Sequence, residues 1–218
     1  MSNQPNLKNK NLPSLWVFFS FEVAVLLSLF YFDNFSAVSA NFHSLLNIRT
    51  SSVLISPLVL FVVNGLLSSD QKAALVFWRI KNILPGCRAF SVHGKNDFRV
   101  DLKRLESIHG PLPVDPKEQN LLWYKIYQSQ RKDSLVQTSH QRFLLARDIV
   151  AISFLFIPLV GVPFIFLGKQ PLNWFYLCLL IFQYLLLMVT ARNYGCRFVT
   201  NVLAGESLKK VVARKKSG

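Results

Sequence analysis

The sequence is poor in charged residues, and acidic residues are the scarcest of them. Asp, Glu, Lys and Arg make up 17% of the 218 residues, while hydrophobic residues make up 51%. An average soluble domain carries about 25% charged residues. A large part of this chain must therefore be solvated by lipid rather than water. The composition excludes an ordinary soluble enzyme, a secreted disulfide scaffold and a disordered tail.

Cysteine is also scarce, and its spacing offers no redox or metal chemistry. The chain has only three cysteines, Cys87, Cys178 and Cys196, and no C-x-x-C arrangement. Its four histidines are scattered, without a second ligand at metal-binding spacing. The motifs of P-loops, dinucleotide-binding folds, zinc proteases and nucleophile elbows are missing as well. We therefore expect no catalytic residue, no cofactor and no metal site.

Long runs without charge predict the membrane spans, because a helix needs roughly 20 apolar residues to cross the hydrocarbon core. Residues 149–167 and 172–191 contain no charged residue and are joined by a very short connection, which predicts an antiparallel pair. Residues 15–32 contain a single charge, Glu22. Residues 51–67 form a weaker candidate that completes an even number of spans. We expect an all-α membrane protein with four transmembrane helices.

The basic residues predict the orientation, since short cytoplasmic flanks of membrane helices carry the excess of Lys and Arg. Segments 1–14, 68–148 and 192–218 hold 23 of the 25 basic residues. All three segments are therefore expected in the cytoplasm, as an N-terminus, a domain and a basic tail. The hairpins 15–67 and 149–191 would then lie in the membrane, which we expect to be a bacterial inner membrane.

A cleaved signal peptide is the competing interpretation of the N-terminus. Lys8 and Lys10 precede an apolar run, and the Val-Ser-Ala sequence at 38–40 resembles a cleavage site. The apolar region is longer than that of a signal peptide, and cleavage would leave an odd number of spans. The first run is therefore interpreted as a membrane span.

Segment 68–148 is too long for a simple connection, and its pattern predicts a small, mainly helical domain. Residues 68–70 provide capping side chains for a helix that we expect to extend through Lys81 and to end at residues 84–86. Residues 86–100 lack a helical period and are interpreted as a loop or a short hairpin.

Three further helix starts are predicted in this domain. Asp101 is expected to cap a short helix that stops at Gly110. Residues 115–118, Asp-Pro-Lys-Glu, form a variant of the capping box. Ser134 is expected to cap a last helix that continues directly into the span 149–167. Such continuity would transmit movement of the domain rigidly into the membrane.

The helix that starts at residues 115–118 is unusually rich in apolar and aromatic residues between positions 121 and 127. Their number exceeds what one buried face needs. Core packing is the first interpretation. The second is an exposed anchor for a cytosolic protein partner, since aromatic residues dominate binding hot spots. The residues of that anchor would be Trp123, Tyr124 and Tyr127.

Basic residues beside the spans are explained first by orientation and by attraction to anionic lipid headgroups. The alternative is that the cytoplasmic face binds nucleic acid or an anionic signal, most readily at the C-terminal tail. That tail lacks the interleaved aromatic residues and glycines of a single-strand binder, so nucleic acid is not expected as a partner. Candidate contacts with the membrane surface are Trp78, Arg79 and Lys81 near the second span, and Lys209, Lys210, Arg214, Lys215 and Lys216 in the tail.

Polar residues within the spans are functional candidates by default, and here they are Glu22, Asn64 and Gln183. Glu22 and Gln183 lie seven and eight residues from the inner ends of their spans. At 1.5 Å per residue both are about 10–12 Å deep, so they are able to meet. Their interaction would either fix helix packing or line a pore.

These features leave three hypotheses of function. The first is a non-enzymatic anchor or sensor that docks a soluble partner or signal in the cytoplasm, couples it to the membrane bundle and self-associates into a homo-oligomer. This layout is similar in outline to small bacterial membrane proteins of stress and antiviral defence complexes. The second is an oligomeric channel or membrane-permeabilising effector lined by Glu22 and Gln183. The third, weaker hypothesis is a lipid-headgroup enzyme that uses His93 or Asp97.

Overall fold

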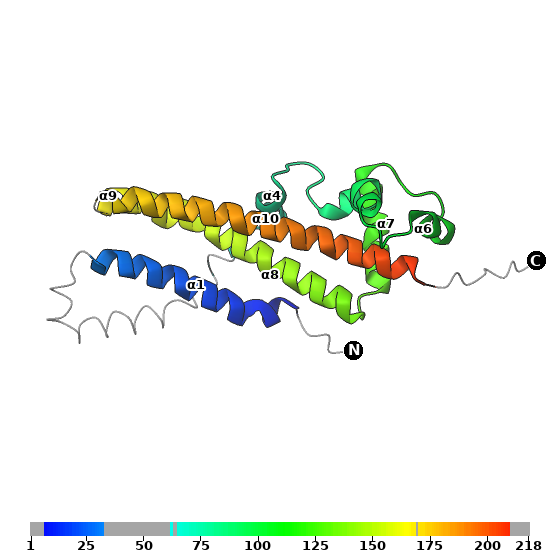
Figure 1. The fold of residues 1–218 in the computed structure, drawn as a ribbon, viewed down its shortest axis with the longest axis horizontal. Coiled ribbons are helices and arrows are strands. Elements are labelled where there is room, and N and C mark those ends of the chain that lie inside the picture. Colours follow the sequence, from blue (N-terminus) through cyan, green and yellow to red (C-terminus); the bar gives the residue numbers. More distant parts are fainter. Residues whose placement is uncertain (1–6, 33–61, 63–64, 169, 210–218) are drawn as a thin grey trace, which may run out of the picture. The chain divides into compact units, whose positions relative to one another are not determined.

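The computed structural model is all-helical over the residues that it describes, which are 7–32, 62, 65–168 and 170–209 (Figure 1). No strand occurs within these ranges. The chain divides into two compact units. The first, here called the bundle unit, comprises Met1–Val76 and Leu144–Thr190. The second, here called the polar unit, comprises Phe77–Phe143 and Ala191–Gly218.

Three helical stretches in the described part of the chain are long and apolar enough to cross a membrane. They are Asn9–Leu29, Ser134–Leu167 and Leu172–Ser207. Each contains most or all of one predicted span, and they support an integral membrane protein. The remaining predicted span, 51–67, lies outside the described residues except for positions 62 and 65–67.

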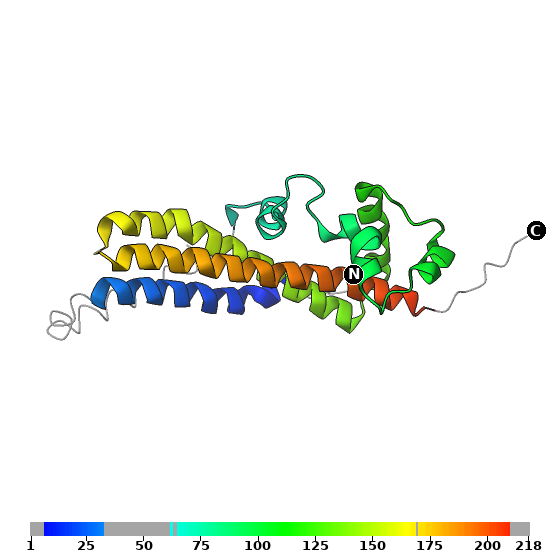
Figure 2. The same cartoon turned by 45° about the horizontal axis from the view of Figure 1, so that its top comes forward.

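The bundle unit is built from α1 (Leu7–Phe32), α9 (Val162–Leu167) and the parts of α8 (Ser134–Phe156) and α10 (Leu172–Ser207) that belong to it. In both ribbon views α1, α9 and the first part of α10 run side by side (Figures 1 and 2). Their shared core is a purely hydrophobic cluster of Leu15, Phe19, Ile152, Phe156, Phe164, Tyr176 and Leu180.

A π-helical turn, Ile157–Gly161, separates α8 from α9. Pro158 lies in this turn; it has no backbone N–H to donate and its ring crowds the preceding turn, so a regular α-helix is not maintained. Gly161 allows close approach to α10, because a Cβ there would lie 2.9 Å from Leu180 Cδ1. The irregular turn thus packs closely against α10.

α4 (Ser69–Phe77) starts as predicted but ends four residues early. Ser68 Oγ accepts from the amide of Gln71 at 3.2 Å, and Gln71 Oε1 accepts from the amide of Ser68 at 2.8 Å. This is a reciprocal capping box. The predicted continuation through Lys81 is wrong, because Trp78 has a φ of 49° and leaves the right-handed helical conformation.

Residues 85–96 form short helical turns rather than the predicted loop or hairpin. They are a 3₁₀ turn at Pro85–Arg88, a π-helical turn at Ala89–His93 and the single turn α5 at Gly94–Asn96. Gln119 Oε1 accepts hydrogen bonds from the amides of residues 90 and 91 at 3.2 and 3.1 Å. A side chain almost thirty residues away therefore satisfies backbone groups that a hairpin would have paired.

The predicted caps of α6 (Leu102–His109) and α7 (Pro116–Ser129) are confirmed. Asp101 Oδ1 accepts from the amide three residues later at 3.0 Å. Asp115 Oδ2 accepts from the next two free amides of its helix at 2.9 and 3.1 Å. Gly110, with a φ of 83°, ends α6 in a conformation that favours glycine.

α8 begins at Ser134 as expected, but its cap is Asp133. The Asp133 carboxylate accepts from the amides of residues 135 and 136 at 2.9 and 3.0 Å. α8 then continues without a break through Phe156, so one helix contributes to both units.

α10 also contributes to both units, because it extends from Leu172 through Ser207. Residues 192–207, which were expected as the start of a basic tail, are therefore the continuation of this helix. The reason is an apolar face that the polar unit buries, formed by Phe198, Val199, Val202 and Leu203. Positions 210–218 lie outside the described part.

An aromatic cluster forms the core of the polar unit around Phe198 of α10. Trp123 and Tyr127 of α7 contact the Phe198 ring with centroid distances of 5.2 and 5.3 Å, both edge to face. His140 of α8 stacks on the same ring at 4.7 Å, and Phe143 lies 6.4 Å away. Phe198 thus joins α7, α8 and α10.

The cap of α7 is testable by Asp115→Ala. Loss of two charge-assisted hydrogen bonds should lower the free energy of unfolding by about 1 kcal/mol, since N-cap aspartates are worth this much. For a chain of this size the unfolding midpoint should fall by about 2–4 °C. Circular dichroism of the detergent-solubilised full chain measures it. Lys125→Ala, an exposed change on the same helix, should shift the midpoint less, and equal shifts would contradict the cap.

Candidate functional site

A cavity of about 700 Å³ in the polar unit is the candidate functional site. Its walls come from residues 93–99, from the first turns of α8 and from residues 194–201 of α10. The volume falls within the range of roughly 300–1,000 Å³ that small-molecule sites occupy. All of its lining residues belong to the polar unit, so one folded unit provides the complete site.

Arginine dominates the charge of this cavity, and one of its three arginines is already neutralised. Arg99 donates to both carboxylate oxygens of Asp97, from Nη2 at 2.7 Å and from Nε at 3.0 Å. This bidentate pair holds the pKa of Asp97 far below its usual range and raises the pKa of Arg99. Arg99 Nη2 also donates to Thr200 Oγ1 at 3.3 Å.

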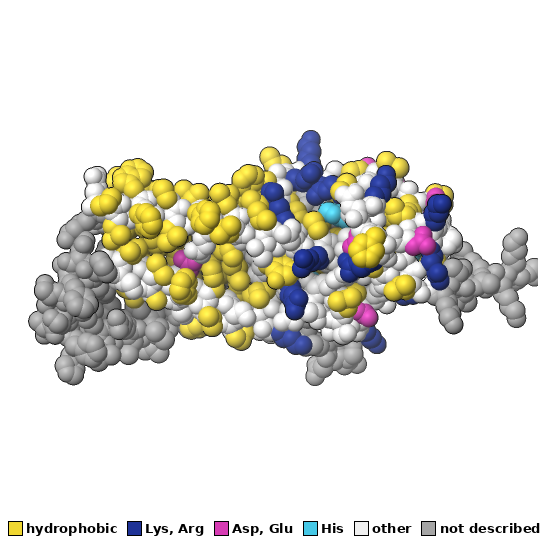
Figure 3. Space-filling model, viewed as in Figure 1, with side chains coloured by type: hydrophobic (Ala, Val, Ile, Leu, Met, Phe, Trp, Pro, Cys, Tyr) yellow, Lys and Arg dark blue, Asp and Glu magenta, His cyan; other side chains and the backbone are white. Residues whose placement is uncertain are grey.

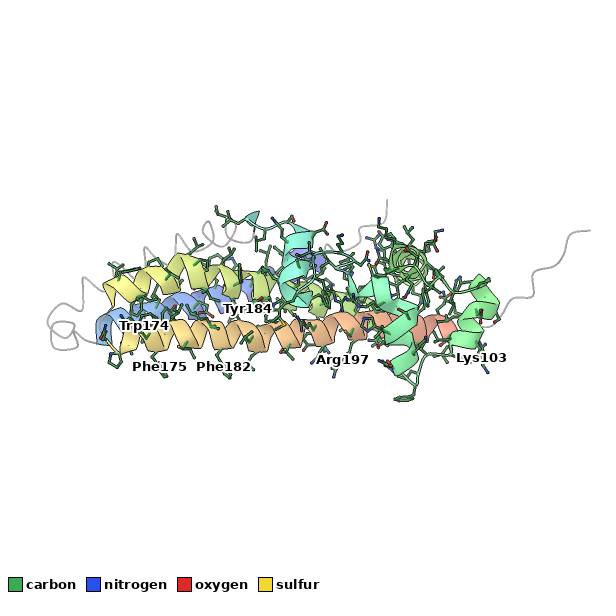
Figure 4. The ribbon with its side chains drawn as sticks, turned by 90° about the horizontal axis from the view of Figure 1, so that it is seen from above. Lys103, Trp174, Phe175, Phe182, Tyr184 and Arg197 are labelled. Carbon is green, nitrogen blue, oxygen red and sulfur yellow. The ribbon has the colours of Figure 1, made fainter. Side chains whose placement is uncertain are left out.

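The other two arginines, Arg142 of α8 and Arg197 of α10, have no acidic partner. Neither guanidinium makes a hydrogen bond or an ion pair with any residue that the structure describes, and both side chains are exposed. Arg197 lies on α10 well beyond the aromatic residues Phe175 and Phe182 (Figure 4). Because Asp97 is the cavity's only acidic lining residue, two positive charges remain uncompensated there.

Uncharged polar groups surround these charges. Asn96, Thr138 and Asn201 line the cavity, and Asn201 Nδ2 donates to Ser139 Oγ at 2.7 Å. Ser139 Oγ in turn donates to the Leu135 carbonyl at 2.6 Å. This chain of hydrogen bonds orients the Asn201 amide within the wall of the site.

His93 lines the same cavity, but its protonation state differs from that of an exposed histidine. Burial lowers the pKa of His93 to about 4, with the charge of Arg88 as the second cause. Its Nε2 is buried without a hydrogen-bond partner among the described residues. The imidazole is therefore neutral at pH 7, and it adds no positive charge to the cavity.

The three aromatic partner-binding candidates are divided between the core and the surface. Trp123 and Tyr127 lie in the aromatic cluster, with 7% and 8% of their surface exposed, so these two side chains follow the first interpretation, core packing, and do not form an exposed anchor. Tyr124 is 51% exposed, and Leu121, three residues earlier on the same face of α7, is 61% exposed. The excess of apolar residues in α7 thus covers a core face and a small exposed patch.

The candidates for membrane-surface contact near α4 are all exposed in the polar unit. Trp78 is accompanied by the exposed side chains of Arg79 and Lys81. Arg192 lies over the Trp78 ring at 5.4 Å from its centroid. This cation–π contact joins α10 to the end of α4, and it was not predicted from the sequence.

The C-terminal lipid candidates differ in what the structure shows. Lys209 Nζ pairs with Glu206 Oε2 at 2.6 Å, so its charge is already compensated within the protein. The buried Glu206 carboxylate also accepts from Gln130 Nε2 at 2.8 Å and lies 3.1 Å from His109 Nε2. This network, which the sequence did not reveal, fastens the end of α10 to α6 and α7. Lys210, Arg214, Lys215 and Lys216 lie outside the described residues.

Two of the three intramembrane polar candidates meet in the bundle unit. Gln183 Nε2 donates a hydrogen bond to Glu22 Oε1, and Glu22 is only 2% exposed. Asn64 lies outside the described residues. A buried carboxylate bonded to the neighbouring helix is the arrangement expected of a packing contact between spans.

A second polar cluster of the bundle unit was not anticipated. Asp148 Oδ1 lies 3.2 Å from Lys72 Nζ and 3.1 Å from Arg147 Nη2, and all three side chains are nearly buried. Close by, Tyr184 Oη donates to the Leu75 carbonyl at 3.0 Å (Figure 4). These contacts tie α4 to α8 and α10 next to the start of the apolar run at residue 149.

The neutral state of His93 predicts a pH dependence of stability. Between about pH 6.5 and 4 the unfolded chain binds a proton at this position that the folded chain does not bind, so stability should fall as the pH falls through this window. Urea unfolding of the full chain at several pH values measures it. His93→Gln should make that decline shallower, whereas the exposed neighbour change Lys95→Gln should leave it as in the wild type. Parallel curves for all three proteins would contradict the assignment.

Comparison of the chain with known proteins finds no match. No protein-family model matches the sequence, and neither a curated protein nor a solved structure matches the chain significantly.

Proposed function

We propose that this chain is a non-enzymatic, multi-pass membrane protein that acts as an anchor or sensor. Its polar unit lies in the cytoplasm, docks a soluble partner or signal, and couples that event to the helices in the membrane. The observation that carries the proposal is the continuity of α8 and α10. Each is one helix that supplies residues both to the cavity unit and to the apolar bundle.

The charge distribution supports the proposed orientation, with both termini in the cytoplasm of a bacterial cell. Most Lys and Arg residues lie outside the apolar segments. On the face in Figure 3, hydrophobic side chains cover most of the bundle unit, while Lys and Arg gather over the polar unit. Such an asymmetry is the usual determinant of membrane orientation.

The exposed pair Leu121 and Tyr124 supports docking of a protein partner. Large apolar side chains that stay exposed together on one helix face favour an interface over an unused surface. Exposed residues along α10, among them Phe175 and Phe182, face lipid or a second copy of the chain in this proposal. The proposed function therefore includes homo-oligomerisation.

The enzymatic alternative receives less support from the same geometry. Asp97 is held by Arg99 in a bidentate pair, and His93 is a weak base because of its lowered pKa. Neither has the protonation behaviour of a general acid or base that works near neutral pH.

Docking at α7 is tested by a photo-reactive phenylalanine analogue in place of Tyr124. Irradiation of intact cells should give a discrete, heavier adduct, because this side chain is exposed at the proposed interface. The same analogue at Glu106, an exposed position of α6, is the matched control. Gel mobility of the affinity-tagged chain measures adduct formation. No adduct at Tyr124, or the same adducts at both positions, would argue against a protein partner.

The channel alternative is separated by release from liposomes. In the proposed function Glu22 fixes helix packing, so the reconstituted wild type should release neither dye nor ions, and Glu22→Gln should behave alike. A channel lined by Glu22 and Gln183 instead predicts release by the wild type that changes in the variant. Release of an encapsulated fluorescent dye measures the difference, and Glu118→Gln outside the spans serves as the control.

A further inference from the structure

We infer that the cavity of the polar unit binds a phosphate-bearing ligand that also carries an apolar or planar group. Arg142 and Arg197 would bind the phosphate, and Phe98 would contact the remainder. Such a ligand would be the signal of the proposed function. Binding itself does not depend on that function, but its biological role rests on it.

The charge of the site selects an anion. Asp97 compensates Arg99, which leaves Arg142 and Arg197 with two uncompensated positive charges in one concave site. The planar guanidinium presents paired donors that match the oxygens of a phosphate group. The neutral His93 adds no charge, so the two arginines alone provide the excess positive charge.

The fold directs the two free arginines to the same place. Arg142 precedes Phe143 on α8, and Arg197 precedes Phe198 on α10, and both phenylalanines are buried in the aromatic cluster. Their packing fixes the rotation of each helix, so that the arginine beside each one lines the cavity. Positions set by a rigid core lose less entropy on binding than charges on a flexible tail.

Phe98 explains why phosphate alone is an incomplete description of the ligand. This cavity-lining side chain is 99% exposed, although it lies directly between Asp97 and Arg99, which pair with each other. An exposed aromatic ring beside an anion site is able to stack on a planar base or to lie along an acyl chain.

Arg142 and Arg197 lie close enough to the predicted spans to reach a lipid headgroup. Arg142 lies seven residues before the apolar run that starts at Ile149, and Arg197 lies six residues after the run that ends at Ala191. At 1.5 Å per residue both are about 9–11 Å from the expected edge of the hydrocarbon core. The headgroup layer is roughly 5–8 Å thick, so the backbone of both residues would lie a few Å outside it, a distance that an arginine side chain spans. A phospholipid and a soluble nucleotide are therefore the two sources of the same chemistry.

The test is binding to the purified full chain in phosphatidylcholine nanodiscs, measured by isothermal titration calorimetry. The probes are dioctanoyl phosphatidic acid, ATP and inorganic phosphate. Arg142→Gln and Arg197→Gln should each weaken binding at least tenfold. Arg131→Gln, an exposed charge outside the cavity lining, should change it less than twofold. Phe98→Ala should weaken the first two probes and leave inorganic phosphate unchanged.

Each outcome decides the inference. Saturable binding of phosphatidic acid alone assigns a lipid source, and binding of ATP alone assigns a soluble one. No saturable binding of any probe, or equal weakening by Arg131→Gln, would overturn it. Arg142→Lys and Arg197→Lys keep the charge and lose the paired donors, so intermediate affinity is expected even if a glutamine variant folds poorly. Because no cellular partner is present, failure here is distinct from failure of the crosslinking experiment.

Discussion

Burial of Phe198 is the interaction on which the polar unit depends. Its ring contacts Trp123 and Tyr127 of α7 and stacks on His140 of α8, so three helices are fixed against one side chain. Aromatic pairs of this kind contribute about 0.5–1.5 kcal/mol each beyond the area they bury. The same contact turns Arg197 toward the cavity, and it converts an expected basic tail into the second half of α10. The contacts of Phe198 therefore both form the core of the polar unit and position a residue of the candidate site.

Polar contacts fulfil a comparable role in the bundle unit, where hydrophobic packing alone specifies helix register poorly. Lipid is as apolar as leucine, so specificity between spans comes from close packing and from interhelical hydrogen bonds. Glu22 with Gln183 joins α1 to α10, and Asp148 with Lys72 joins α8 to α4. Removing one partner of a buried ion pair is far more destabilising than removing both. These pairs thus explain why charged side chains are buried in an apolar unit, and a pore is not needed to explain them.

Much of the local structure was predictable, because its causes are local. Asp101, Asp115 and the Ser68 box cap their helices by bonds to amides within three residues, which spacing alone reveals. The errors fall where distant groups decide. The helix after Ser68 stops at Phe77 because Trp78 turns into the left-handed region, and the turns around residue 90 are held by Gln119 from α7. Asp133 caps α8 in place of Ser134. Both side chains are able to accept a hydrogen bond from a free amide, and the backbone geometry decides which of them reaches it.

From the order of the amino acids it already follows that the chain is helical, that it has segments able to cross a membrane, and that most of its basic residues lie outside them. Composition and periodicity suffice for this, since lipid demands long apolar runs whose backbone groups are satisfied internally. Only the tertiary structure decided which aromatic residues are core and which are surface, and which arginines converge. Trp123 and Tyr124 are adjacent in sequence, yet only Tyr124 is exposed. Arg142 and Arg197 are 55 positions apart, and they line one cavity because the helices that carry them pack around the same phenylalanine.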